Sequence, residues 1–406
     1  MSRSAEQQPR RVPGLVAASI LALSVVTGCD WNSSPTRPPP APAPTASSAP
    51  PSPAKPPQAP TPSVDAFVEV AAGNQHSCAR RQSGAVECWG RNTYGQLGNG
   101  ARDDSAALVA VTGLVDAVEV EAGGDFSCAR RKSGAVVCWG NNQDGQLGDG
   151  RGAEVGVWSS RPTAVAGLTD ATDVGVGDAF ACALRRGGEV QCWGLGENGQ
   201  VGSSGERAFA RPRPITGVST VASLAVGGQH VCVAERSGRV MCWGRNTEGQ
   251  LGDNGNTSRS NARPVPGLTD AQALIAGGRH TCALRRGGQV SCWGDGRQGQ
   301  LGLGAGAARE RSPRAVAALT GLTDIVAGDQ HSCALVSADE LRCWGDNSEG
   351  QIDASRRPML TPTKVAGVRG VVDVAAGHRH TCVVASGKVY CWGLADRGAL
   401  GPNPRG

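Results

Sequence analysis

The sequence predicts an all-β protein assembled from one sheet unit that is repeated along the chain. Seven tryptophans recur at spacings of 50, 54, 50, 50, 51 and 48 residues. Glycine accounts for 59 of the 406 residues, about twice its usual share. No segment keeps an apolar period of 3.6 residues over the length of a helix. A period near 50 residues with short apolar runs is typical of a β-propeller or a solenoid.

The first 28 residues have the features of an export signal. A basic start (Arg3, Arg10, Arg11) precedes an apolar run over 12–26, which is too short for a comfortable membrane span. Small residues then lead to Cys29, and this end resembles a bacterial lipobox. The resemblance implies cleavage before Cys29 and a lipid on its thiol. We therefore expect an exported, membrane-anchored lipoprotein in the periplasm or at the cell surface; an ordinary signal peptide followed by an incidental cysteine is the alternative.

Residues 29–64 are expected to form a Pro-rich disordered tether. Thirteen of the 25 prolines lie between Pro35 and Pro62. Such a segment has few apolar residues to bury and adopts polyproline II conformations. Fully extended at ~3.1 Å per residue, it reaches on the order of 100 Å.

The repeats occupy residues 65–406, and one copy can be divided into four strands. The first strand, as in VEVAAG, has the small residues that fit near the axis of a propeller. The second and third strands, HSCAR and AVECWG in the first copy, are joined by a tight turn. A long loop follows, and then a strand such as RPTAVAGL over 161–168. Its proline suits an edge strand.

Glycines mark the turn between the second and third strands. In five copies a three-residue loop ends in a glycine, where a positive φ is needed; these are Gly84, Gly134, Gly188, Gly238 and Gly288. Asp339 takes this place in the sixth copy, as a tolerated substitute. The seventh copy has one residue fewer, which predicts a two-residue turn, Ser386-Gly387.

All seven copies resemble the regulator-of-chromosome-condensation repeat, through H-[ST]-C-A-L followed by G-x-V-x-C-W-G-x-N-x-x-G-Q-L-G. The resemblance covers about 340 residues by the extent of the repeats. It implies a single seven-bladed β-propeller of four-stranded antiparallel blades. Only six clear outer strands are present, and an open ring would expose an edge. We hypothesise that residues 62–64 supply the seventh, so that deleting residues 58–64 would lower the thermal stability.

Fourteen of the 15 cysteines form seven pairs, each within one hairpin. Opposed positions on antiparallel strands lie within disulfide range, and an exported location permits oxidation. We expect seven disulfides; buried free thiols are the alternative, and two cysteines per hairpin do not make a zinc site. The expected pairs are Cys78 with Cys88, Cys128 with Cys138, Cys182 with Cys192, Cys232 with Cys242, Cys282 with Cys292, Cys333 with Cys343, and Cys382 with Cys391.

The recurring histidines and tryptophans are interpreted as structural. Five copies carry a histidine two residues before the first cysteine, but Phe126 and Phe180 hold this slot in the other two. Phenylalanine neither binds a metal nor moves a proton, so the slot requires a flat ring. We expect the tryptophans to pack between blades and the G-Q-L-G glutamines to brace their loops. No catalytic residue, metal site or cofactor motif is assigned.

Basic residues gather at the turn between the second and third strands, and all such turns emerge on one face of a propeller. Attraction to anionic envelope polymers or lipid head groups is one interpretation. Pairing with Asp116, Asp170, Asp270 and Asp324 is the other, and we favour it. The basic residues are Arg80, Arg81, Arg130, Arg131, Lys132, Arg185, Arg186, Arg236, Arg285 and Arg286.

The opposite face carries the long loops after each C-W-G, and it is the expected recognition surface. Three aromatic residues outside the repeat pattern, Tyr94, Trp158 and Phe209, are candidate partner contacts. The sequence therefore favours a non-enzymatic, monomeric envelope scaffold that binds a protein or an envelope polymer. The net charge of +5 does not argue for nucleic acid.

The family resemblance suggests other functions. They are guanine-nucleotide exchange, the role of the founding member, and inhibition of a secreted enzyme, since a β-lactamase inhibitor shares the fold. Because propellers also host polysaccharide lyases and hydrolases, the fold alone does not exclude an enzyme.

Overall fold

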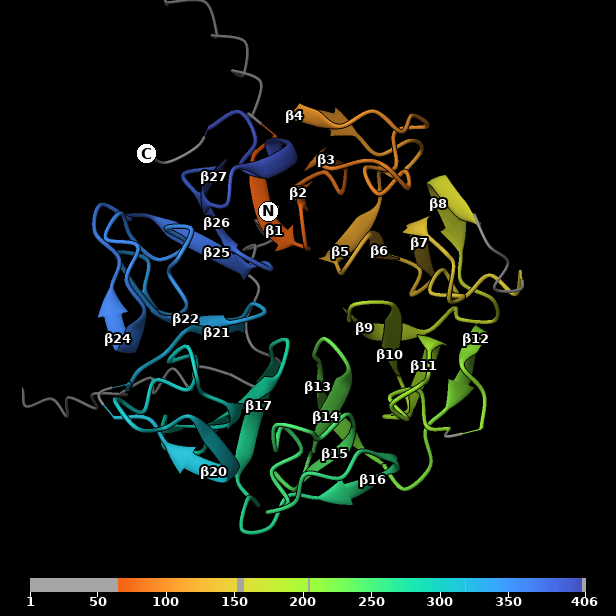
Figure 1. Cartoon of the computed structure of the whole chain (residues 1–406). Coiled ribbons are helices and arrows are strands. Elements are labelled where there is room, and N and C mark those ends of the chain that lie inside the picture. Colours follow the sequence, from red (N-terminus) through yellow and green to blue (C-terminus); the bar gives the residue numbers. More distant parts are fainter. Residues whose placement is uncertain (1–64, 152–156, 204, 318, 404–406) are drawn as a thin grey trace, which may run out of the picture. The chain divides into compact units, whose positions relative to one another are not determined.

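A computed structural model describes residues 65–151, 157–203, 205–317 and 319–403, and these residues form a ring of seven antiparallel sheets (Figure 1). The predicted seven-bladed propeller is therefore confirmed. Six sheets have four strands, and the seventh, from the end of the chain, has three within the described residues. In every blade the strands run in chain order from the axis to the perimeter.

The strands fall into four sets by their distance from the axis. The innermost are β1 (Phe67–Ala72), β5 (Ala117–Ala122), β9 (Ala171–Val176), β13 (Val221–Val226), β17 (Ala271–Ala276), β21 (Asp324–Ala327) and β25 (Val371–Ala376). The second are β2 (His76–Arg81), β6 (Phe126–Arg131), β10 (Phe180–Arg185), β14 (His230–Glu235), β18 (His280–Arg285), β22 (His331–Ser337) and β26 (His380–Ala385). The third are β3 (Val86–Gly90), β7 (Val136–Asn141), β11 (Val190–Leu195), β15 (Val240–Gly244), β19 (Val290–Asp295), β23 (Glu340–Gly345) and β27 (Lys388–Gly393). The outer ones are β4 (Ser105–Ala110), β8 (Trp158–Ala164), β12 (Ala208–Pro214), β16 (Arg259–Pro264), β20 (Arg309–Ala315) and β24 (Met359–Lys364).

The outer strand begins and ends earlier than the motif predicts. In the second blade it covers Trp158–Ala164 instead of 161–168. Val165 and Leu168 instead follow the strand and are buried, with exposed fractions of 4% and 1%. The second half of the motif is therefore apolar because it is buried in the link to the next blade, and not because it pairs with a neighbouring strand.

The hairpin turns agree with the prediction in six copies and differ in one. Gly84 and its four equivalents have φ between 82° and 99°, and Ser386 and Gly387 both have positive φ. In the sixth hairpin Asp339 is not at positive φ, so the expectation for it was wrong. Ser337 pairs with Glu340 there, and the connection is a two-residue turn with a register shift. The extra residue is absorbed in the strand and not in the loop.

The hydrophobic core lies between successive blades. One cluster joins Cys78, Leu97 and Val111 of the first blade to Ala129 and Trp139 of the second. The repeat produces one such cluster for each blade boundary. Each blade therefore depends on its neighbour to bury its apolar face, as in other repeat proteins.

The ring closes through contacts between the last blade and the first, which lie side by side (Figure 1). The Val70 N–H donates to the Asp373 carboxylate at 2.7 Å, and the Phe67 N–H donates to the Gly387 carbonyl at 3.1 Å. A short 3-10 helix, η1 (Asp396–Gly398), leads to Ala399, whose carbonyl accepts the Trp89 indole N–H at 2.9 Å. Residues 62–64 lie outside the described residues. That they complete the last blade therefore stays a prediction from the sequence.

Candidate functional site

Each blade carries one disulfide across its central hairpin. The two cysteines occupy directly opposed positions on the second and third strands, for example Cys78 and Cys88 on β2 and β3. Their Cα atoms lie 4.0–4.2 Å apart in all seven bonds.

The structure contains all seven expected pairings. All fourteen residues are buried, so the bonds act on the scaffold and are not an accessible redox site. Beyond the first blade, the bonded pairs are Cys128 with Cys138, Cys182 with Cys192, Cys232 with Cys242, Cys282 with Cys292, Cys333 with Cys343, and Cys382 with Cys391.

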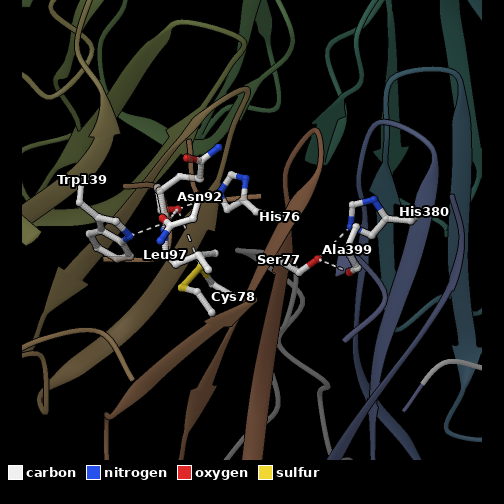
Figure 2. Close-up of a disulfide and its surroundings, with 11 residues drawn as sticks. His76, Ser77, Cys78, Asn92, Leu97, Trp139, His380 and Ala399 are labelled. Atoms are coloured by element: carbon white, nitrogen blue, oxygen red, sulfur yellow. Dashed lines mark hydrogen bonds between the residues drawn. A yellow bond between two sulfur atoms is a disulfide. The ribbon is translucent and has the colours of Figure 1, made fainter. Parts of the chain in front are cut away.

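A hydrogen-bonded relay joins the histidine of one blade to the next blade (Figure 2). The His76 Nε2 lies 2.9 Å from the Ser127 hydroxyl, and that hydroxyl donates to the Gln96 carbonyl at 3.0 Å. The Trp139 indole N–H donates to the same carbonyl at 2.8 Å. Because the hydroxyl proton goes to the carbonyl, the hydroxyl accepts from His76, which fixes the proton of this imidazole on Nε2.

The relay recurs wherever the slot holds histidine. The four other histidines contact a hydroxyl of the following blade at 2.8–2.9 Å, in the pairs His230–Thr281, His280–Ser332, His331–Thr381 and His380–Ser77. The last of these crosses the closure from the seventh blade to the first. The position two residues before the first cysteine, which the sequence predicts to require a flat ring, therefore lies at the junction between two blades.

The two phenylalanines confirm the structural interpretation and add a rule that the sequence analysis missed. In the copy after each phenylalanine, the hydroxyl position holds an apolar residue: Ala181 follows Phe126, and Val231 follows Phe180. A polar ring is thus paired with a hydroxyl, and an apolar ring with an apolar side chain, at all seven junctions. Aligning each ring with the next copy would have revealed this pattern.

Burial holds all five histidines in the neutral form. It lowers the pKa of His76, His230 and His380 to about 3, and that of His280 and His331 to about 4. Their Nδ1 atoms have no hydrogen-bond partner, which fits a neutral ring with its proton on Nε2. A buried neutral ring of this kind serves packing and is not poised for acid–base chemistry at neutral pH.

The G-Q-L-G loops are braced as predicted. The side-chain oxygen of Gln96 accepts the Tyr94 N–H at 2.9 Å, and the carboxamide oxygen of Asn92 accepts the Leu97 N–H at 3.0 Å. Equivalent glutamine bonds occur in the next five copies. They fix the loop carbonyl that receives the tryptophan.

A central channel with a volume of about 660 Å³ runs between the innermost strands. Carboxylates at its wall bond the backbone of the next blade: Glu69 accepts the Val120 N–H at 3.2 Å, and Glu119 accepts the Val174 N–H. Arg80 and Arg130 pair with these same carboxylates, each at 2.6 Å. These charges hold blades together, so they are not free to bind a ligand.

One mouth of the channel is polar. The Asp329 carboxylate lies 3.2 Å from His378 Nδ1, and Asp178 accepts a hydrogen bond from the Gln229 amide at 3.4 Å. Desolvation within the channel and the charge of Asp329 raise the pKa of Asp178. His378 and His380, which form an H-x-H pair in the sequence, differ: His378 is half-buried, whereas His380 is buried. Within the described part of the chain, no group of three or more His, Cys, Asp or Glu side chains has a metal-binding arrangement.

The strand connections define two faces of the propeller. The turn face carries the turns between second and third strands and the links between blades, and the loop face carries the loops after each C-W-G. On the turn face the favoured ion pairs form at three positions, Arg131–Asp116, Arg185–Asp170 and Arg285–Asp270, at 2.7–2.9 Å. Asp324 accepts the N–H of Ile325. Ion pairing thus accounts for part of the basic arc only.

The three aromatic residues predicted to contact a partner occupy different settings. Trp158 begins β8 and is 37% exposed, with the Arg102 guanidinium 4.5 Å from its ring. Tyr94 and Phe209 are half-buried, and Phe209 packs against a core cluster. Arg91 lies 5.8 Å from the Tyr94 ring, and Arg213 lies 4.3 Å from the Phe209 ring. Of the three, Trp158 offers the most accessible surface.

Cys29, the signal peptide and the tether lie outside the described residues. Among the residues that are described, no helix has the length and apolar character needed to cross a membrane. Lipidation at Cys29 thus remains a prediction from the sequence.

The fold and its repeated hairpins define a repeat propeller, and comparison with family profiles identifies the repeat. Two profiles of the regulator of chromosome condensation (RCC1) repeat match. The first covers residues 67–96, 117–146, 171–200, 221–250, 322–351 and 371–399. The second covers 83–130, 133–184, 187–234, 237–284 and 287–335. The chain therefore belongs to the RCC1 repeat family.

Similarity to individual proteins is distant. Human E3 ubiquitin-protein ligase HERC2 is 27% identical over 141 residues, which is 34% of this chain and 3% of that protein. Human WBSCR16 superposes with a TM-score of 0.72 at 24% identity, over 79% of this chain and 87% of that one. Yeast RCC1 (Prp20), solved bound to Kap60, superposes with a TM-score of 0.69 at 22% identity, over 83% and 81%. At these identities the two structures support the fold alone.

Proposed function

We propose that this chain is an exported, lipid-anchored envelope protein whose propeller binds a protein partner and has no enzymatic activity of its own. Seven intrablade disulfides favour an oxidising compartment, since such bonds persist outside the cytosol. The sequence around Cys29 favours attachment through lipid. A ring cross-linked in every blade is a rigid support for a recognition surface.

The observation that carries the binding proposal is the stack of Arg102 on Trp158. The indole is accessible, and it stands on a strand of the second blade, where the β7–β8 ladder fixes its backbone. Arg102 comes from the loop of the first blade and also donates to the Thr93 carbonyl at 2.8 Å. Tryptophan and arginine are the side chains that most often dominate protein interfaces. The stack presents both at one place, already ordered.

A protein partner is also in keeping with the fold relatives, since yeast RCC1 (Prp20) was solved in complex with Kap60. Because the sequence identity to yeast RCC1 is low, we take from it only that the partner is a protein, and not which protein it is. The partner itself is to be found by capture from the parent envelope.

The test is chemical cross-linking and capture with the full-length protein expressed in its parent cell. Trp158→Ala should weaken capture of the specific partner by about 30-fold or more, the range of an interface hot spot. Val115→Ala is the matched control, because Val115 is an exposed apolar residue, 68% accessible, on the turn face. Equal capture by the wild type and by Trp158→Ala would refute this site.

The anchor is tested separately. Cys29→Ser should abolish incorporation of labelled fatty acid and move the protein from the membrane fraction to the soluble fraction. Labelling that persists in Cys29→Ser would contradict the lipoprotein assignment without affecting the binding proposal.

A further inference from the structure

Four exposed cations stand at one equivalent position on the turn face of four consecutive blades. They are Lys132, Arg186, Arg236 and Arg286. Each follows the last residue of a second strand, directly before the Ser-Gly or Gly-Gly of the turn. They belong to the basic arc, but they are distinct from the arginines whose ion pairs were described above.

A repeated backbone hydrogen bond fixes the position of these four residues along the propeller axis. In each case the N–H of the cationic residue donates to a carbonyl of the preceding link, at 2.8–3.1 Å, in the pairs Lys132–Asp116, Arg186–Asp170, Arg236–Thr220 and Arg286–Asp270. The same bond in successive blades of a ring places the backbone of the four residues at equivalent positions on the turn face.

Within the described ranges, none of these four side chains forms an ion pair. The preceding residues Arg131, Arg185 and Arg285 do, and in the fourth blade the preceding residue is Glu235. The pKa of Asp170 is lowered chiefly by its hydrogen bond from Arg185, and Arg186 is the smallest contributor. The carboxylates of Asp116, Asp170 and Asp270 are therefore already paired with the arginine that precedes the cation.

One of the four cations has a backbone partner. The Arg286 guanidinium donates to the Ser237 carbonyl at 3.3 Å, in the turn that carries Arg236. A carbonyl does not neutralise the guanidinium, so Arg286 keeps its full positive charge beside the neighbouring turn.

The charge is confined to one sector of the ring. The equivalent residues are Gln82 in the first blade and Ser386 in the seventh, and the sixth blade has Asp339 and Glu340 at its turn. If the cations served only to keep the turns soluble, any polar residue would suffice at all seven blades. At this one turn position, only blades two to five carry a cation.

The chain reaches the propeller on this same face. The Asp65 carboxylate accepts the Ser83 N–H at 3.0 Å, and the Ala66 carbonyl accepts the Gln82 N–H at 2.9 Å. Ser83 and Gln82 belong to the turn of the first blade. The segment that leads back to Cys29 therefore joins the turn face and not the loop face.

We propose that the turn face of blades two to five docks on an anionic lipid surface through Lys132, Arg186, Arg236 and Arg286. The proposal rests on the lipid anchor, which would hold this face near a membrane at high effective concentration. A set of cations at equivalent positions on one face matches a layer of phosphate head groups, and each cation adds to the attraction within a Debye length. Docking on this face leaves the loop face free for a partner.

The test measures binding of the chain from residue 29 onward, with Cys29→Ser so that no lipid contributes. Flotation with vesicles of phosphatidylcholine is compared with vesicles that also contain phosphatidylglycerol. The protein should bind only the anionic vesicles, and less as salt is raised. Replacing the four cations by glutamine should weaken binding by on the order of 1,000-fold, from about 1 kcal/mol for each cation.

A matched control removes the same charge elsewhere. Arg161, Arg211, Arg356 and Arg357 are exposed cations on the perimeter and loop face, without an ion pair among the described residues. Their replacement by glutamine should change vesicle binding far less. Equal loss in both quadruple variants would overturn the site, because binding would then follow net charge alone. Binding of soluble polyanions with no binding of anionic vesicles would overturn the lipid surface as the ligand.

The outcome is separable from that of the proposed function. The turn-face variant should still capture the partner of the loop face, and Trp158→Ala should still bind anionic vesicles. Fluorescence of the buried tryptophans, compared with that of the wild type, checks that both quadruple variants are folded.

Discussion

The relay between blades shows how a single position accommodates two kinds of side chain. Histidine is accepted where the following blade offers a hydroxyl, and phenylalanine where it offers a methyl or isopropyl group. A buried N–H without an acceptor costs about 1–3 kcal/mol. The choice at one copy is therefore tied to the choice at the next.

A double-mutant cycle at His230 and Thr281 tests this coupling. Thr281→Val leaves the His230 Nε2–H without its acceptor and should lower the free energy of unfolding by about 1–3 kcal/mol. Adding His230→Phe recreates the natural Phe180–Val231 pair and should recover much of that loss. Denaturant titration gives the four values. Additive effects of the two substitutions would contradict the relay.

The hairpin is the element that the sequence describes most completely. Its spacing predicts the turn, the opposed cysteines and the strand register, because all three depend on residues close in the chain. Each disulfide closes a loop of about ten residues, which corresponds to roughly 2.7 kcal/mol on the chain-entropy estimate.

Removing one disulfide should therefore weaken the fold by about that amount. The double variant Cys282→Ala and Cys292→Ala is expected to lose roughly 3 kcal/mol while keeping the ring, because six other hairpins remain cross-linked. Denaturant titration of the variant and of the wild type measures the difference. As a control, wild-type protein denatured in the presence of alkylating reagent, without reductant, should have none of the fourteen cysteines modified. Alkylation of all fourteen would show that the bonds are absent in the native protein.

The outer strands are the elements that the sequence describes least well. The R-P-x-x-V motif was assigned to a strand, but its valine and the following leucine pack in the core beyond the strand end. A paired outer strand and a buried link between blades both produce a short apolar pattern. The pattern alone therefore does not distinguish the two.

The closure determines the stability of the whole ring. Ala399 is 1% exposed, and its carbonyl replaces the glutamine carbonyl that accepts the tryptophan N–H at five other junctions. Deleting residues 395–406 removes this acceptor and the packing around it, so it should lower the stability by about 3 kcal/mol or more. Deleting residues 404–406 alone is the control and should have little effect. A thermal melt that is unchanged by the longer deletion would show that closure does not depend on these contacts.

Acid should destabilise the whole ring through the five buried histidines. Their pKa values in the folded protein are about 3 to 4, below the ordinary value of about 6.5. The unfolded chain therefore binds more protons below pH 6.5, so stability is complete above that pH and falls as the pH drops toward 3. A pKa lowered to about 3 corresponds to on the order of 5 kcal/mol for one histidine.

The measurement is the free energy of unfolding as a function of pH, from pH 7.5 to about 3, which spans the ordinary histidine pKa and the lowered values in the folded protein. The variant with His230→Phe and Thr281→Val should show a shallower decline than the wild type, because one titrating site is lost. Parallel curves would mean that His230 does not titrate in this way.

The sequence by itself determined the repeat, the seven blades, six of the seven hairpin turns and the cysteine pairs, because these follow from local spacing copied seven times. It also indicated a structural role for the histidine slot, through Phe126 and Phe180. Only the tertiary structure decided which blade each ring contacts, how Ala399 closes the ring, and which arginines of the turn face are paired. Those outcomes depend on contacts between residues about fifty to three hundred positions apart, which a repeat spacing does not specify.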